Sequence, residues 1–149
     1  MVKYRLCDYP AHAPFPGATI RCSPHVDYGS ATLIFEDGEP GLQVWRAESE
    51  TWQPVPPGAR GDALLLFGWC TCVRSNGRVN ALKHRVVVEE QPPGATPVAP
   101  RRVSLVLFAA PPPDARIDPV VASADEEVLF RNGVAGNWRT QSMRAHLLV

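Results

Sequence analysis

The sequence lacks the features of several broad protein classes. Its 149 residues carry 15 basic and 15 acidic side chains, so it has neither a basic field for nucleic acid nor an acidic tail for a basic partner. No stretch approaches the roughly 18 consecutive apolar residues of a membrane span, and residues 1–5 contain no apolar signal-peptide core. We therefore expect an intracellular, cytoplasmic protein with no nucleic-acid or membrane partner. These absences leave the oligomeric state open.

The cysteines are not arranged as a zinc ribbon or a redox pair. The four cysteines, Cys7, Cys22, Cys70 and Cys72, contain no C-x-x-C pair. We expect buried or half-buried free thiols, which are typical of intracellular proteins. A disulfide or a metal role is the alternative.

Proline, in contrast, is abundant. The 16 prolines disfavour long helices and suit short strands joined by turns. Short apolar runs between turn signals predict strands near residues 4–7, 19–22, 31–35, 42–46, 52–55, 63–67, 82–88 and 103–108. The run 63–67 is the most apolar and is predicted to be a central strand, and residues 36–41 are predicted to form a turn. This spacing is typical of an all-β sandwich or barrel.

The predicted strands end at a run of three prolines, residues 111–113. We therefore expect an all-β core over residues 1–110 and a C-terminal extension over residues 111–149. Ser123 and Glu126 have capping-box spacing and predict a short helix to about Arg131. Asn137 could cap a second short helix that continues to the end of the chain.

Three residues have the chemistry of a metal site. His25 and Asp27 form an H-x-D unit, and alternate residues of an extended chain point the same way, so both could grip one ion. His84 would have to come from another strand. Two histidines and a carboxylate occupy one face of an octahedral ion and leave the other open, as in non-haem Fe(II) oxygenases. The alternative is a surface His25 beside a turn-forming Asp27, with His84 bonded to backbone.

A possible anion receptor begins the last predicted strand. Arg102 and Ser104 stand two residues apart and share one face of that strand. A guanidinium fork and a neighbouring hydroxyl together suit the far carboxylate of a dicarboxylate. The alternative is a solvated pair of arginines, Arg101 and Arg102, that opens an edge strand.

These residues belong to a longer set of motifs in a specific order: His25-Val26-Asp27-Tyr28-Gly29, Gly41-Leu42-Gln43-Val44, Ser75-Asn76-Gly77-Arg78, Leu82-Lys83-His84-Arg85-Val86 and Arg102-Val103-Ser104. In this order and spacing the sequence resembles the isopenicillin N synthase-like branch of the Fe(II)- and 2-oxoglutarate-dependent dioxygenases. The resemblance covers about residues 3–110.

The resemblance implies a fold, a site and a reaction. The implied fold is a double-stranded β-helix, a jelly-roll or cupin-like barrel. The implied iron ligands are His25, Asp27 and His84, and the implied 2-oxoglutarate contacts are Arg102, Ser104 and Tyr9. The implied reaction uses O₂ and 2-oxoglutarate to hydroxylate or desaturate a small organic substrate, and it releases succinate and CO₂.

The sequence also departs from the family pattern. Cys7 stands where the family usually has asparagine, and Gly68-Trp69 replaces the commoner Gly-Asp. The chain begins at the barrel, without the N-terminal region that buttresses it in the family, so we expect exposed apolar surface and a poorly stable or self-associating chain. Two other functions stay open: a relative that uses Fe(II) and O₂ without 2-oxoglutarate, and a non-catalytic or truncated barrel module.

Overall fold

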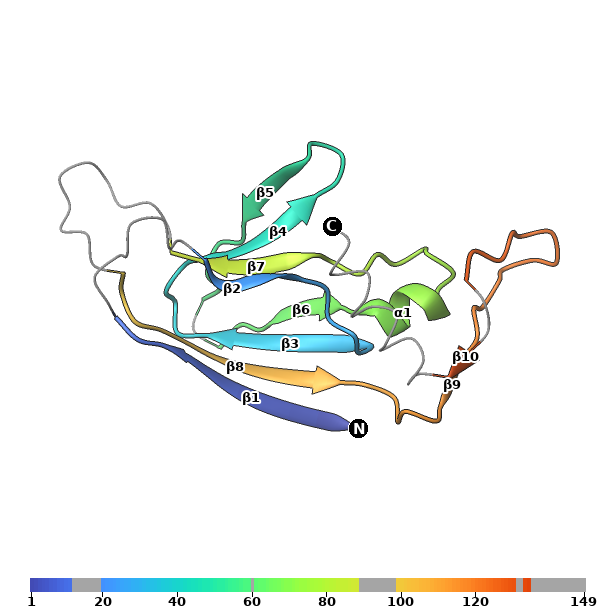
Figure 1. The fold of residues 1–149 in the computed structure, drawn as a ribbon, viewed down its shortest axis with the longest axis horizontal. Coiled ribbons are helices and arrows are strands. Elements are labelled where there is room, and N and C mark those ends of the chain that lie inside the picture. Colours follow the sequence, from blue (N-terminus) through green and yellow to red (C-terminus); the bar gives the residue numbers. More distant parts are fainter. Residues whose placement is uncertain (12–19, 60, 89–98, 131–132, 135–149) are drawn as a thin grey trace.

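The computed structural model describes residues 1–11, 20–59, 61–88, 99–130 and 133–134 (Figure 1). Its elements, in chain order, are β1 (Val2–Tyr9), β2 (Ile20–His25), β3 (Ala31–Glu36), β4 (Leu42–Arg46), β5 (Thr51–Pro54), β6 (Leu64–Phe67), α1 (Trp69–Arg74), β7 (His84–Val87), β8 (Arg102–Ala109), β9 (Arg116–Ile117) and β10 (Gly133–Val134).

Two four-stranded antiparallel sheets form the body of the molecule. One has the strand order β1-β8-β3-β6 and the other β2-β7-β4-β5, so the chain repeatedly crosses from one sheet to the other. This two-sheet arrangement is a jelly roll, and the predicted fold is confirmed. The short pair β9 and β10 forms a separate two-stranded sheet.

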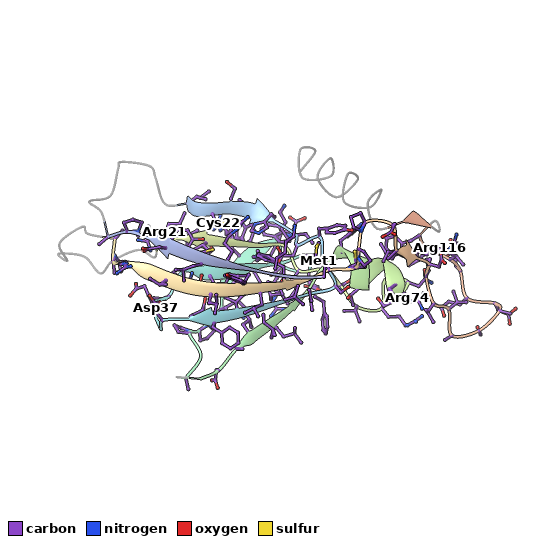
Figure 2. All side chains as sticks on the ribbon, turned by 90° about the horizontal axis from the view of Figure 1, so that it is seen from below. Met1, Arg21, Cys22, Asp37, Arg74 and Arg116 are labelled. Atoms are coloured by element: carbon purple, nitrogen blue, oxygen red, sulfur yellow. The ribbon has the colours of Figure 1, made fainter. Side chains whose placement is uncertain are left out.

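The core lies between the two sheets, where Figure 2 shows side chains from both layers. Ile34, Leu66 and Val106 point inward from the first sheet and meet Leu42 and Val86 from the second. Along β3, buried and exposed residues alternate, as expected of a strand with one face in the core.

The outer face of the first sheet is apolar and open. The strand 63–67, predicted to be central, is β6 at the edge of its sheet, and this prediction is wrong. Its Leu65 is 47% exposed and its Phe67 is 40% exposed. A continuous apolar run is typical of a strand that is buried on both faces. The outer face of β6 is nevertheless exposed in this chain, so the apolar run alone did not identify a central strand. Other exposed apolar residues on the outer face are Tyr4, Leu6, Leu33, Phe35 and Leu105.

Helix α1 follows β6 and was not predicted, because threonine, valine and cysteine have low helix propensity. Tertiary contacts hold it instead. Gly68 packs so closely on the loop after β2 that a Cβ there would collide with the Gly29 carbonyl oxygen. The Trp69 amide then donates to the Asp27 carbonyl at 2.8 Å. The helix therefore anchors the loop that carries Asp27.

The helix predicted from Ser123 is wrong over its described part, because residues 123–130 form turns and bends. The Glu126 carboxylate accepts hydrogen bonds from Asn76, Arg78 and the Ala122 amide. These contacts draw the segment onto the turn after α1. The second predicted helix lies outside the described residues.

The C-terminal part of the described chain lies beside α1. Arg74 of α1 donates to the Asp118 carbonyl at 2.8 Å. Figure 2 shows Arg74 and Arg116 together at one end of the molecule, with Asp37 at the other. No helix among the described residues is long and apolar enough to cross a membrane.

Candidate metal centre

The pairing of β2 with β7 brings two histidines together. His25 ends β2, His84 begins β7, and the two residues are direct partners in the register of the strands. Their ring centroids lie 4.3 Å apart. Asp27 follows two residues after His25, in the loop that α1 anchors. Sequence-distant residues thus meet at one end of the second sheet, where Figure 1 shows β2 beside β7.

The three side chains converge on one point. Asp27 Oδ1 lies 3.7 Å from His25 Nε2, and Asp27 Oδ2 lies 4.0 Å from His84 Nε2. One potential ligand atom from each residue lies within 4.8 Å of the other two. Metal–ligand bonds of about 2.0–2.2 Å would need only a small contraction of this set. Two imidazoles and one carboxylate suit a divalent transition metal with open coordination positions.

Hydrogen bonds on the far side of each imidazole orient it toward that point. His25 Nδ1 lies 2.8 Å from the Ser23 carbonyl, and His84 Nδ1 lies 3.0 Å from the Leu82 carbonyl. A carbonyl only accepts, so each Nδ1 carries a proton, and in the neutral ring the Nε2 lone pair faces Asp27. The backbone contact of His84 foreseen in the alternative interpretation is therefore present, and it leaves Nε2 directed at the site.

Thr32 of β3 holds the carboxylate. Its hydroxyl is fully buried and donates to Asp27 Oδ2 at 2.5 Å. This residue was not identified from the sequence. Its inward position follows from the alternation along β3, but its contact with Asp27 depends on how the two sheets pack.

Cys22 lies against the more exposed histidine. Its Sγ is 3.9 Å from His25 Nδ1. This contact raises the pKa of His25 above its usual value, with the Ser23 carbonyl acting in the same direction and burial opposing it. The contact with His25 likewise lowers the pKa of the Cys22 thiol. All four cysteines are free thiols.

Arg102 and Ser104 lie deep in the barrel. Arg102 is 1% exposed, although β8 places it at a strand end. Its Nη1 lies 3.4 Å from Ser104 Oγ, its Nε donates to the Glu39 carbonyl at 3.2 Å, and its Nη2 pairs with Glu36. The alternative of a solvated arginine pair on an edge strand is wrong for Arg102, because β8 runs between β1 and β3 and Arg102 is buried, while Arg101 is exposed.

Tyr9 completes this group. The Arg102 guanidinium carbon lies 6.0 Å from the centroid of its ring. Burial raises the pKa of Tyr9 to about 12, and Cys22 and Cys7 add to the effect. The phenol therefore remains a hydrogen-bond donor at neutral pH. Cys7, which stands in place of the family's asparagine, lies beside it.

One cavity of about 90 Å³ joins the two groups. Its lining includes His25, Asp27 and His84 at one side and Arg102 and Tyr9 at another. Other lining residues are apolar (Ile34, Leu42, Val86, Val106 and Phe108), together with Arg5, Cys7, Cys22 and Thr32. The arrangement offers three metal-binding side chains and a buried cation within one largely apolar space.

A sequence model of the 2OG-Fe(II) oxygenase superfamily matches residues 1–111. The chain belongs to this superfamily. It is 32% identical over 114 residues to gibberellin 3-beta-dioxygenase 1 of Oryza sativa subsp. japonica, covering 76% of this chain and 27% of that protein. It is 35% identical over 118 residues to 2-oxoglutarate-dependent dioxygenase frbA of Dothideomycetidae sp. (strain 11243), covering 76% and 35% respectively. The chain thus spans about a third of the length of these relatives.

Solved structures share the fold. A full-length Neurospora crassa protein, solved in complex with alpha-KG, superposes with a TM-score of 0.78 at 28% identity, covering 95% of this chain and 44% of that one. The complex of JOX2 with 2OG, Fe and JA gives a TM-score of 0.75 at 28% identity, covering 95% and 39%. The jelly roll described above is therefore the fold of known members of the superfamily.

Proposed function

We propose that this chain is the catalytic core of a dioxygenase that uses Fe(II), 2-oxoglutarate and O₂ to oxidise a small organic substrate. The observation that carries the proposal is the single cavity lined by both the histidine–aspartate cluster and the buried Arg102. Residues 1–110 form this core, and residues 111–149 form an extension of it. Free thiols at all four cysteines support an intracellular location.

His25, Asp27 and His84 would hold the iron. The donor set fits, because both imidazoles direct Nε2, the ring nitrogen that is unprotonated in the neutral form, toward Asp27, which offers a carboxylate oxygen. When bound, iron would supply the activation of O₂ that is coupled to conversion of 2-oxoglutarate into succinate and CO₂. Thr32 fixes the carboxylate, so that the ligand set is preorganised by contacts from both sheets.

Arg102, Ser104 and Tyr9 would bind the distal carboxylate of 2-oxoglutarate. Arg102 is a buried cation and therefore interacts more strongly with an anion than a solvated arginine would. Holding that end of the molecule fixes which end faces the metal ligands. Apolar side chains form part of the wall of this space, which strengthens the attraction between a bound anion and Arg102.

The substrate is a small organic molecule, and its oxidation is a hydroxylation or a desaturation. This part of the proposal is supported by relatives whose names are those of hydroxylases and dioxygenases of small molecules. The matched structures include the same Neurospora crassa protein in complex with thymine, and JOX2 in complex with JA. No nucleic-acid or membrane partner is proposed.

Turnover and metal binding test the proposal together. The full chain should bind one Fe(II) in anaerobic equilibrium dialysis and release labelled CO₂ from 1-¹⁴C-2-oxoglutarate in air. Replacing His25, Asp27 or His84 with alanine should abolish both. Iron affinity that is equal in wild type and all three variants would refute the ligand assignment. Consumption of O₂ without succinate would instead identify a member that does not use 2-oxoglutarate.

A further inference from the structure

The anion receptor already holds an anion of the protein itself. Glu36, the last residue of β3, pairs through its carboxylate with Arg102 Nη2. Its direct partner in the β3–β8 register is Ser104, so its side chain enters the barrel beside the two residues assigned to 2-oxoglutarate. The Glu36 side chain is 10% exposed, and that of Arg102 is 1% exposed. This ion pair is therefore almost completely removed from water.

Arg102 has limited capacity for a second carboxylate. Its Nε donates to the Glu39 carbonyl, and one side of the guanidinium is taken by Glu36. A 2-oxoglutarate carboxylate at the remaining donors would lie close to the Glu36 carboxylate in a space of low polarity, where like charges repel strongly. Burial raises the pKa of Glu36, while Arg102 opposes that effect.

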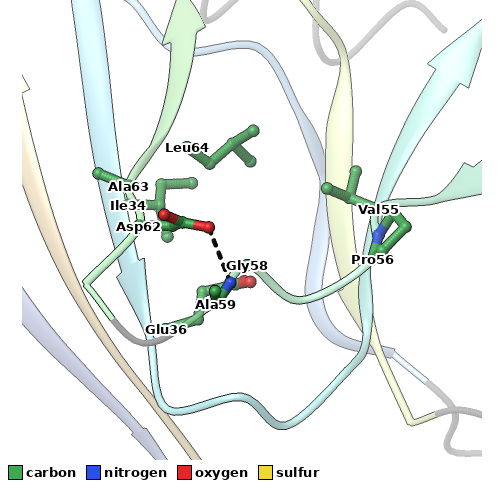
Figure 3. Close-up of a pocket in the computed structure, with 9 residues that line it drawn as sticks. All are labelled: Ile34, Glu36, Val55, Pro56, Gly58, Ala59, Asp62, Ala63 and Leu64. Atoms are coloured by element: carbon green, nitrogen blue, oxygen red, sulfur yellow. Dashed lines mark hydrogen bonds between the residues drawn. The ribbon is translucent and has the colours of Figure 1, made fainter.

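A second cavity provides room for the Glu36 side chain to move away from Arg102. Glu36 also lines a space of about 260 Å³ beneath the loop between β5 and β6, together with Val55, Ala59 and Leu64 (Figure 3). Asp62 lies in the same wall and accepts a hydrogen bond from the Ala59 amide at 2.8 Å, drawn as a dashed line in Figure 3. Glu36 thus lines this second cavity and at the same time pairs with Arg102, which lines the cavity of the candidate metal centre.

We propose that Glu36 is an internal counter-anion: it occupies Arg102 when 2-oxoglutarate is absent and is displaced into the second cavity when the distal carboxylate binds. The inference rests on the proposed function. It makes Glu36 a positioning residue that keeps the guanidinium in place and lowers the affinity for the co-substrate. The energy needed to separate the ion pair is subtracted from the binding of 2-oxoglutarate.

The variant Glu36→Gln removes the competing charge and keeps an oxygen that accepts from Arg102. Its 2-oxoglutarate affinity should rise about tenfold or more, because the buried cation then lacks its own anion. The affinity for 2-oxopentanoate, which has a methyl group in place of the distal carboxylate, should change by less than about twofold. A merely structural Glu36 would weaken both ligands or leave both unchanged.

The experiment is an anaerobic calorimetric titration of the Fe(II)-loaded full chain with each ligand. Asp8→Asn is the matched control: it removes an exposed carboxylate of the same sheet that pairs with Arg101 and not with Arg102, and its 2-oxoglutarate affinity should equal that of wild type. Unchanged or weaker 2-oxoglutarate binding by Glu36→Gln, with wild type still binding, would overturn the inference alone. No binding by either protein would overturn the proposed function as well.

A structure of wild type with metal and 2-oxoglutarate gives a second test that does not depend on a variant folding. The Glu36 carboxylate should have left Arg102 and lie in the second cavity. A retained contact between Glu36 and Arg102, with 2-oxoglutarate also on Arg102, would overturn the displacement.

Discussion

Removal of the Arg102 guanidinium is the change whose effect the structure defines most fully. Losing one partner of a buried charge pair costs about 2–5 kcal/mol of binding, which is roughly 30- to 5,000-fold in 2-oxoglutarate affinity. In this chain, however, Arg102→Ala also leaves the Glu36 carboxylate buried and unpaired. An uncompensated buried charge costs about 3–5 kcal/mol of folding stability, so the single variant mixes binding with unfolding.

The double variant Arg102→Ala/Glu36→Gln separates the two effects. Compared with Glu36→Gln alone, it isolates the loss of the guanidinium without creating a buried charge. We expect the 2-oxoglutarate affinity to fall by roughly 30- to 5,000-fold, as calculated above for the loss of one charged partner. Fe(II) binding should survive, because neither substitution touches the histidines or Asp27.

The assay is calorimetric titration of the iron-loaded protein under argon, with unfolding by urea measured on the same samples. Arg101→Ala is the matched control: this neighbouring arginine is 64% exposed and pairs with Asp8 at the surface, and its loss should leave 2-oxoglutarate affinity unchanged. Arg102→Lys should not restore binding, because an ammonium does not reproduce the planar fork. Equal affinity in the double variant and in Glu36→Gln would refute the assignment of Arg102.

Four further outcomes are expected. Ser104→Ala should weaken 2-oxoglutarate binding by about 1–2 kcal/mol in the same titration, since it removes one neutral donor; no change would exclude Ser104 as a contact. Thr32→Val should lower Fe(II) affinity about 10- to 100-fold in equilibrium dialysis, because Asp27 loses its buried donor, and an unaltered affinity would contradict that role. Gly68→Ala should reduce the free energy of unfolding in urea by about 1–3 kcal/mol, because its Cβ would meet the Gly29 and Asp27 carbonyls; full stability would contradict the close packing. Wild type should self-associate in sedimentation velocity, and Leu65→Lys/Phe67→Lys should reduce this by charging the open face; a monomeric wild type would contradict the expected association.

Strand positions could be predicted from the sequence because alternation and turn residues are local signals. The strand predicted at residues 42–46 is β4, with the same bounds. The neighbouring turn prediction, 36–41, missed one important residue: Glu36 is the last residue of β3 and its side chain enters the barrel. Glu36 is followed by Asp37 and Gly38, and these residue types are typical of turns. Only the strand pairing of Glu36 with Ser104 and the burial of Arg102 show that the Glu36 side chain lies inside the barrel.

The metal-binding residues of the candidate site could be predicted from the sequence, but the contacts that hold them in place could not. The H-x-D spacing and the family resemblance indicated His25, Asp27 and His84, and the structure brings them together through the β2–β7 register. The contacts that orient them come from Thr32, the Leu82 carbonyl and α1. Thr32 and Leu82 lie only five and two residues from the side chains that they hold, whereas α1 docks on the Asp27 loop from far along the chain. No sequence motif specifies any of these contacts. Helix α1 itself forms against its residue propensities because it docks on the Asp27 loop.

The visible spectrum of the anaerobic Fe(II) protein tests the central claim most directly. A 2-oxo acid that chelates iron at the histidine–aspartate cluster gives a charge-transfer band, so the band reports metal and co-substrate in one cavity. Addition of 2-oxoglutarate to the Fe(II)-loaded full chain should produce this band with one-to-one stoichiometry, and His84→Ala should lack it. An Fe(II)-loaded wild type that shows no band at saturating 2-oxoglutarate would contradict the account.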